Sequence, residues 1–135
     1  MASFTKFNSF VEALAEKTHN LGSDTLKVAL TNSAPSASNT VLANITEVSY
    51  SNLSSRTITI ASSAQTSGTY KLVFNDLVLT ASGAVGPFQY VVLYNDTATN
   101  DELIGYYDYG ASVTLANTDT FTVDFDGSAG VLTIA

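Results

Sequence analysis

The sequence predicts a mainly β domain, an antiparallel β-sandwich or small barrel of about eight strands with one N-terminal helix. The hydrophobic period changes from about 3.6 to about 2 near residue 24, and alternating segments then recur at regular spacing. Charged residues make up only 13% of the chain, so Ser, Thr and Asn supply the polar surface, and these residues suit strands and turns. With 135 residues, the chain fits one domain, 1–135.

The first element is predicted to be a helix over about residues 5–19. Ser9, followed three residues later by Glu12, could form a capping box. Asn20 and Gly22 tolerate left-handed backbone and are typical of helix ends. The residues that share one face at helical spacing are Phe7, Phe10, Val11, Leu14 and Thr18.

Strands are predicted along the rest of the chain, about residues 24–135. Phe88–Tyr94 is almost wholly apolar on both faces, so we expect it to be the buried central strand. Asn32–Asn44 and Ser62–Gly68 are expected to be polar loops, and Gly86-Pro87 to break the chain. The other predicted strands cover residues 25–31, 56–61, 70–74, 77–80, 103–109, 113–115, 121–125 and 131–134.

The charge distribution argues against nucleic-acid and membrane partners. The net charge is −7, and no Lys or Arg follows Lys71. Phosphate backbones and anionic lipid surfaces are bound by clustered cations, which this chain lacks. No cysteine is present, and no apolar run or signal-peptide pattern stands out. We therefore expect a soluble protein that is made in the cytoplasm.

No catalytic site can be assembled from the residue types present. His19 is the single histidine, and a Ser-His-Asp site would have to use it together with Asp24. No nucleophile motif accompanies it, so His19 is interpreted as a cation that complements the dipole at the helix end. Asp124 and Asp126 are interpreted as a solvated strand face rather than as an acid–base pair. We expect neither enzyme activity nor a cofactor.

Calcium is the best of the weak candidates for a metal. Asp96, Asp101 and Glu102 crowd one loop with the oxygen ligands that calcium prefers. Acidic residues also favour turns for conformational reasons, and this remains the favoured interpretation.

Three tyrosines lie close together in one predicted strand. Tyr107 and Tyr109 share a face, while Tyr106 points the other way. One face should belong to the core, and the other could contact a partner, because Tyr is enriched at protein interfaces.

The amino-acid sequence of several segments resembles that of a family of small virion proteins of tailed bacteriophages. The similarity covers nearly the whole chain, although Ser49–Arg56 is shorter here than the glycine-rich stretch typical of the family. The segments that carry the resemblance are Lys6-Phe-Asn-Ser-Phe-Val-Glu12, His19-Asn-Leu-Gly-Ser-Asp-Thr-Leu-Lys-Val-Ala-Leu-Thr-Asn32, Ser63-Ala-Gln-Thr-Ser-Gly-Thr-Tyr-Lys-Leu-Val73, Gly86-Pro-Phe-Gln-Tyr-Val-Val-Leu-Tyr-Asn-Asp96 and Phe121-Thr-Val-Asp-Phe-Asp126.

The resemblance implies a head decoration (cement) protein on the outer capsid surface of the virion. Its implied partners are the major capsid protein and copies of itself, as a trimer or else a dimer. Candidate contact residues are Phe4, Phe7, Phe10, Tyr107 and Tyr109. For Phe7 and Phe10, packing on the domain's own sheet is an equally good interpretation.

Two alternatives remain open from the sequence. The chain could be a tail-associated virion module, in a tail tube or fibre. It could also be a β-sandwich module that binds calcium or carbohydrate.

Overall fold

The structure, a computed structural model, describes residues 2–135. Within this range it contains nine strands, one α-helix and one 3-10 helix. The helices are α1 (Phe10–Ala15) and η1 (Leu42–Asn44). The strands are β1 (Thr5–Lys6), β2 (Leu26–Thr31), β3 (Ile60–Thr66), β4 (Thr69–Phe74), β5 (Leu77–Thr80), β6 (Val85–Asn95), β7 (Leu103–Leu115), β8 (Thr120–Val123) and β9 (Leu132–Ile134).

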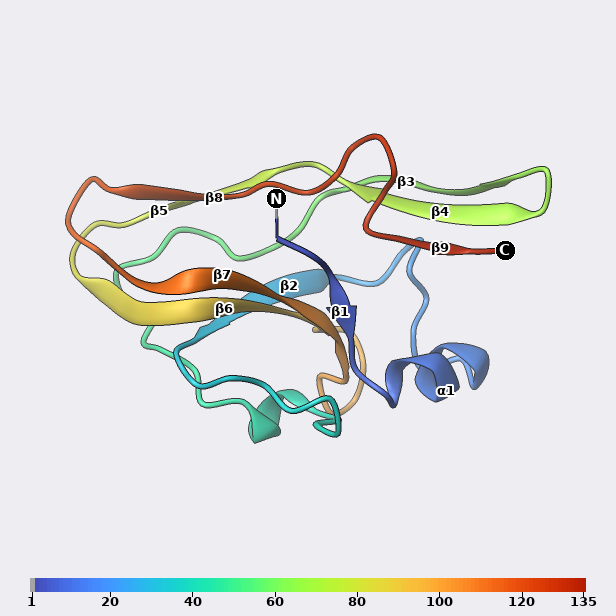
Figure 1. Cartoon of the computed structure of the whole chain (residues 1–135), viewed down its shortest axis with the longest axis horizontal. Coiled ribbons are helices and arrows are strands. Elements are labelled where there is room, and N and C mark those ends of the chain that lie inside the picture. The colour runs from blue at the N-terminus through green and yellow to red at the C-terminus, as the bar shows by residue number, and fades with distance from the viewer. Residues whose placement is uncertain (1) are drawn as a thin grey trace.

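The strands form two facing layers, as the sequence predicts (Figure 1). One layer is a four-stranded sheet in the order β1-β7-β6-β2. The other layer combines a three-stranded sheet, β3-β4-β9, with the two-stranded sheet β5-β8. All six strand pairings are antiparallel. No helix in the described residues has the length and apolar character needed to cross a membrane.

The central strand β6 is buried on both faces, which explains why its sequence is apolar on both. Val91 and Leu93 face the main core between the two layers. Val92 and Tyr94 face a second core on the other side of the four-stranded sheet. The segment that contains η1 covers this second core with Leu42 and Ile45, and it lies below the sheet in Figure 1.

The outer edge of β2 is covered by an irregular segment, residues 48–58. Backbone bonds join the two: Val28 N to Arg56 O at 3.0 Å and Ile58 N to Leu26 O at 2.9 Å. The Arg56 guanidinium donates to Val28 O at 2.8 Å and lies 3.7 Å from the ring centroid of Tyr50. These contacts satisfy the edge groups that would otherwise invite another strand.

The helix is shorter than the predicted range of about 5–19 and spans only Phe10–Ala15. The first five residues of the predicted range have a different structure. Thr5 and Lys6 pair with Tyr106 and Gly105 as β1 instead of starting a helix. Pairing with β7 places the Phe7 side chain in the second core, where it is fully buried. A turn closed by Phe10 N and Phe7 O, at 3.2 Å, then carries Phe10 into the main core. Long-range burial has therefore outweighed local helical spacing.

The helix caps also differ from the prediction. Ser9 is the N-cap residue, but its side chain makes no capping bond, so the predicted capping box with Glu12 is wrong. At the other end, Lys17 has a left-handed backbone with φ of 71°. Its amide bonds to Leu14 O, and Thr18 N bonds to Ala13 O at 2.8 Å. This Schellman arrangement ends the helix before Asn20 and Gly22 are reached.

Two segments predicted as breaks lie within strands. Most of the predicted polar turn at Ser62–Gly68 belongs to β3, and the turn itself is only Ser67 and Gly68, both with positive φ. Two such residues suit the tight turn of a hairpin. Gly86-Pro87 lies inside β6, at a register shift between Val85 and Phe88. The two predicted strands at 103–109 and 113–115 are one strand, β7.

We expect Phe7→Ala to lower the free energy of unfolding by about 3–5 kcal/mol, because it leaves a cavity in the small second core. Urea denaturation measures this change. Val78→Ala is the control, since Val78 is 52% exposed and should shift stability by about 0.5 kcal/mol or less. Equal losses for the two variants would contradict the placement of Phe7.

Candidate functional site

Two surfaces combine exposed apolar side chains with a concave shape. The first, here called the aromatic groove, runs between β7 and β8 and has a volume of about 160 Å³. Tyr107, Tyr109, Phe121 and Asp124 are among its lining residues. Tyr109 is 57% exposed, which is unusual for so large an aromatic side chain. Its ring packs edge-on against Phe121, with centroids 5.1 Å apart.

A bulge in β7 positions Tyr109. Along this part of the sheet, Asp108 to Val113 on β7 lies opposite Tyr90 to Phe88 on β6, so β7 carries the extra residues. Asp108 Oδ1 accepts bonds from Gly110 N at 2.7 Å and from Gln89 Nε2 at 2.9 Å. Gly110 has φ of 88°, a conformation that favours glycine. The bulge therefore holds Tyr109 at the surface, as bulges commonly do for functional side chains.

The groove is largely apolar, and Asp124 is the one acidic residue among the described residues that line it. The Tyr107 ring packs between Phe4 and Phe125, at centroid distances of 5.6 and 6.1 Å. Burial, helped by the charge of Asp126, raises the pKa of Tyr107 to about 12, so its hydroxyl stays neutral. The Asp126 pKa is lowered by bonds from the amides of Ala129 and Ser128. Asp126 therefore remains charged beside this groove.

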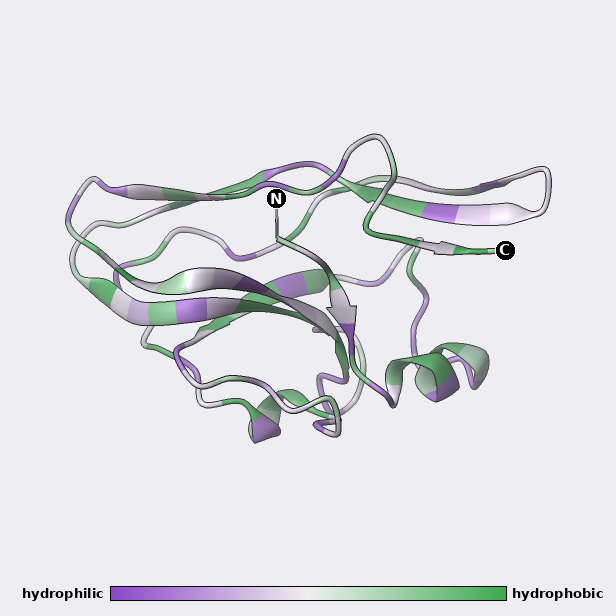
Figure 2. Ribbon diagram, viewed as in Figure 1, coloured by the Kyte–Doolittle hydropathy of each residue, from purple (hydrophilic) through white to green (hydrophobic). Residues whose placement is uncertain are grey.

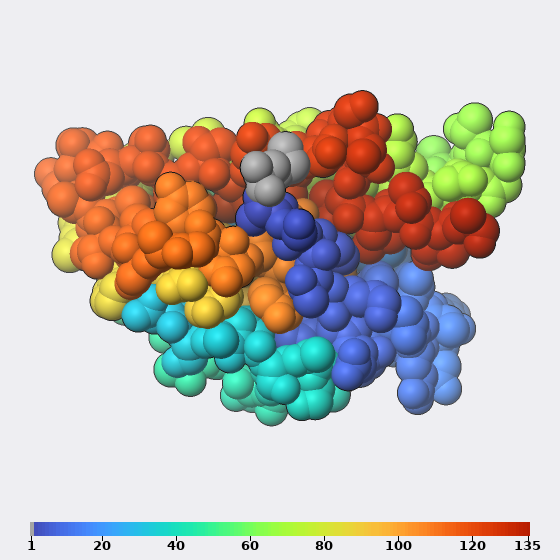
Figure 3. Space-filling view, viewed as in Figure 1, coloured from blue at the N-terminus to red at the C-terminus, as the bar shows by residue number. Residues whose placement is uncertain are grey.

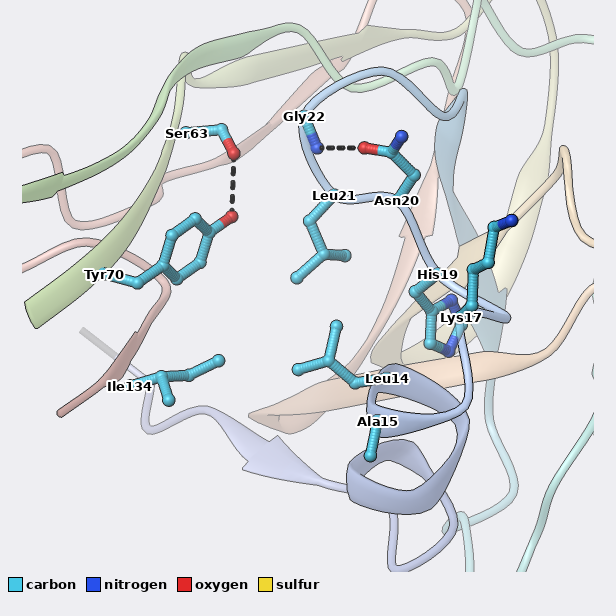
Figure 4. A pocket seen from close by; sticks show the side chains of 10 residues that line it. All are labelled: Leu14, Ala15, Lys17, His19, Asn20, Leu21, Gly22, Ser63, Tyr70 and Ile134. Carbon is cyan, nitrogen blue, oxygen red and sulfur yellow. Dashed lines mark hydrogen bonds between the residues drawn. The ribbon is translucent and has the colours of Figure 1, made fainter.

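The second surface, here called the helix–strand cleft, separates α1 from β9 and the β3–β4 hairpin. One part has a volume of about 500 Å³, and a neighbouring part along α1 and β9 has about 360 Å³. Both parts share Leu14, Ala15 and Ile134. Figure 4 shows Leu14 and Leu21 on one side of the first part, facing Ile134 and Tyr70 on the other.

The cleft has cations at its margins and exposed apolar residues at its mouth. Lys17 lines the first part and Lys6 the second, and within the described residues no Asp or Glu lines either part. Val11 is 51% exposed and Ile134 45% exposed. Helix α1 is largely green in Figure 2, since five of its six residues are apolar. It therefore presents apolar surface to the cleft.

A polar network lies behind His19, which lines the cleft. Asn95 Oδ1 accepts bonds from the amides of Thr97 and Ala98, so its Nδ2 is the donor atom of the side chain. This Nδ2 lies 2.7 Å from Asp24 Oδ2 and 3.0 Å from His19 Nδ1. His19 Nδ1 must then accept, which assigns the proton of the neutral ring to Nε2. His19 Nε2 is buried and has no partner among the described residues.

This network corrects the interpretation of His19 as a helix-end cation. Burial lowers the pKa of His19, and the charges of Glu102 and Asp24 only partly oppose that effect. His19 is 5% exposed and packs against the ring of Phe10. Its imidazole accepts from Asn95 rather than donating to Asp24, so the arrangement is not that of a Ser-His-Asp site.

The five candidate contact residues have different positions in the structure. Phe7 and Phe10 are buried in the two cores, so the alternative that they pack on the domain's own sheet is confirmed. Phe4 is half-buried between Tyr107 and the helix–strand cleft. Tyr107 and Tyr109 line the aromatic groove together, as their shared face predicts.

The three weak calcium candidates, Asp96, Asp101 and Glu102, make other contacts in the structure. Asp96 forms an ion pair with Lys27 at 3.1 Å, and Glu102 accepts bonds from Asn100. Within residues 2–135, no three His, Cys, Asp or Glu side chains come together as a metal site. Burial raises the pKa of Asp101, with further contributions from the charges of Asp96 and Glu102. The ionised form of the Asp101 carboxyl is therefore disfavoured in the folded protein.

The cleft was not predicted from the sequence. Its walls come from the two ends of the chain and from the hairpin, and no local motif links Leu14, Tyr70 and Ile134. The one sequence feature that could have indicated the cleft is Ile134, a large apolar residue in a short strand near the end of the sequence.

Comparisons with known proteins do not extend these observations. No protein-family model matches the chain, and neither the curated proteins nor the solved structures gave a match.

We expect the free energy of unfolding to fall as the pH is lowered from about 7.5 to about 5. The folded-state pKa of His19 lies below its ordinary value, so near pH 6 the unfolded chain binds a proton that the folded chain does not. Urea denaturation at several pH values measures this dependence. Because His19 is the single histidine, His19→Gln should flatten the curve in this range. An unchanged slope would contradict the burial of a neutral ring.

We also expect Asp101→Asn to stabilise the protein by about 0.5 kcal/mol. Asn removes the unfavourable charge and tolerates the positive φ of 52° at this position. Thermal unfolding at neutral pH measures the change. The matched control is Asp108→Asn, because the Asp108 carboxylate accepts two bonds and its loss should not stabilise. Stabilisation that is equal in both variants would count against this explanation.

Proposed function

We propose that the protein is a structural virion protein of a tailed bacteriophage. In this proposal it is a head decoration protein that binds the outer capsid surface and stabilises contacts between major capsid subunits. It acts through surface contacts and not through catalysis. Its partners are the major capsid protein and other copies of itself. The resemblance of nearly the whole chain to small phage virion proteins supports the virion setting.

The observation that carries the proposal is that exposed apolar residues line two concave surfaces, the aromatic groove with Tyr109 and the helix–strand cleft with Val11 and Ile134, which Phe4 connects. Val11, Tyr109 and Ile134 are three of the four large apolar side chains that are most exposed in the described residues. Parts of α1, β7, β8 and β9 are visible together on the face seen in Figure 3, with the N-terminal segment between β7 and α1. We call this the contact face. Exposed apolar patches rimmed by polar groups are typical of protein-binding surfaces.

A protein of this kind can stabilise a shell without tight binding by each copy. Molecules that bind only the assembled shell shift its equilibrium away from disassembly. When bound copies also contact one another, the effective concentration of each is raised by its neighbours. Contact area is then the main requirement, and the structure provides it on a rigid two-layer scaffold.

The test is to mix the purified protein with capsids that lack it, recover the particles by sedimentation and count the bound copies. We expect saturable binding at a fixed ratio to capsid subunits, together with a higher melting temperature of the shell. No binding to heads would contradict the proposal. Recovery of the protein only in tails would favour a tail tube or fibre module instead.

A further inference from the structure

The aromatic groove and the helix–strand cleft are neighbours on the contact face. The N-terminal segment lies between them and lines both: Ala2 belongs to the aromatic groove, whereas Phe4 and Lys6 belong to the cleft. The Phe4 ring also packs against Tyr107 of the groove, 5.6 Å away. The two surfaces therefore form one continuous face and are held at a fixed separation.

The charges of the two surfaces are complementary. Asp124 lines the aromatic groove, whereas the charge of nearby Asp126 is partly balanced by Lys71. Lys6 and Lys17 line the cleft, and within the described residues no acidic side chain does so. The chain has only five Lys and Arg residues against twelve acidic ones. Two of the chain's five cationic residues therefore lie at the margin of this one cleft, which gives it a local excess of positive charge.

Two strands on this face also have a free edge. β8 pairs only with β5 and β9 only with β4 among the described residues, so each has a free edge. β9 forms one wall of the cleft, and β8 contributes Phe121, Thr122 and Val123 to the aromatic groove, followed by Asp124 just after the strand. Neither β8 nor β9 contains the Lys or Pro that commonly protects a free edge from pairing.

From these observations we propose that two copies of this chain associate face to face through the contact face. The aromatic groove of each copy, with Tyr109 on its bulge, packs against the helix–strand cleft of the other. Asp124 of one copy then lies near the cations at the other copy's cleft margin. The occupant of the cleft is thus a second copy of this chain.

A two-fold axis accounts for the placement of both surfaces on one face. When two identical faces meet, the two-fold axis lies in the plane of contact. If the groove lies on one side of this axis and the cleft on the other, the groove of each copy opposes the cleft of its partner. The groove–cleft contact therefore forms twice in one closed dimer. This covers Val11, Tyr109 and Ile134, so the exposed apolar residues of the contact face serve the contact between copies, and the opposite side of each copy is left for the capsid protein. The inference rests on the proposed function and deepens it, because it names the self-contact of the decoration protein.

The first experiment compares the wild-type protein with three variants by analytical ultracentrifugation over a range of concentrations. Val11→Asp alters the cleft, Tyr109→Asp alters the groove, and Val78→Asp is the control, on an equally exposed valine of β5. Asp is compatible with the first turn of a helix, so Val11→Asp should leave the fold intact. Circular dichroism and thermal unfolding check that each variant is folded.

We expect the wild-type protein and Val78→Asp to form dimers with equal affinity. Val11→Asp and Tyr109→Asp should each weaken the dimer about 30-fold or more, as loss of a central anchor does. Mixing these two variants should give a heterodimer, because the intact groove of one still fits the intact cleft of the other. Lys6→Glu should also weaken the dimer, and adding Asp124→Lys in the same chain should restore much of the affinity.

Three results would overturn the inference. These are a wild-type protein that stays monomeric at about millimolar concentration, dimers that persist in both Asp variants, and a mixture that forms no heterodimer. Head binding separates this inference from the proposed function. A monomer that binds heads would refute the dimer alone, whereas a dimer that ignores heads would refute decoration alone. If the monomer bound heads and Val11→Asp abolished that binding, the cleft would belong to the capsid protein.

Discussion

The burial of β6 on both faces is the constraint on which the rest of the structure depends. A strand with apolar side chains on both sides needs a cover on each. The facing β layer supplies one cover, and the segment around η1, with Phe7, supplies the other. Residues 32–47 are rich in Ser, Asn and Ala and lack regular strands, yet their position is fixed because Leu42 and Ile45 must reach the second core. Full burial of a large apolar side chain such as Phe7 there contributes roughly 1.5–3 kcal/mol.

The same constraint places the N-terminal segment. Phe7 enters one core and Phe10 the other, so the chain wraps around the end of the four-stranded sheet within three residues. The bond from Asn95 to His19 then ties the loop after α1 to the end of β6. Helix α1 is therefore fixed at both ends, although its six residues are too few to form a stable helix on their own. The helix–strand cleft exists because this anchored helix stands opposite the β3–β4 hairpin.

The fold class, the central strand and most of the other strands could be predicted from the sequence, because each depends on a hydrophobic pattern that is visible locally. The prediction failed where contact with a segment distant in sequence determines the local structure. Thr5 and Lys6 are a strand only because β7 offers them an edge, and the helical spacing around Phe7 arises from burial in two separate cores. In the candidate site, the shared face of Tyr107 and Tyr109 followed from strand geometry. The bulge that exposes Tyr109 did not, because it depends on the register with β6.

The pairing of β1 with β7 has a consequence for the time course of folding. Thr5 pairs with Tyr106, about one hundred residues away in sequence, so a very long loop must close before this contact forms. During synthesis the first residues leave the ribosome several seconds before β7 and β9 exist, at about 5–20 residues per second. The contact face, which joins the N-terminal segment to β7, β8 and β9, therefore cannot assemble before these strands have been synthesised. Nascent chains cannot associate through it until their two-layer scaffold is complete, which delays assembly until the fold can support it.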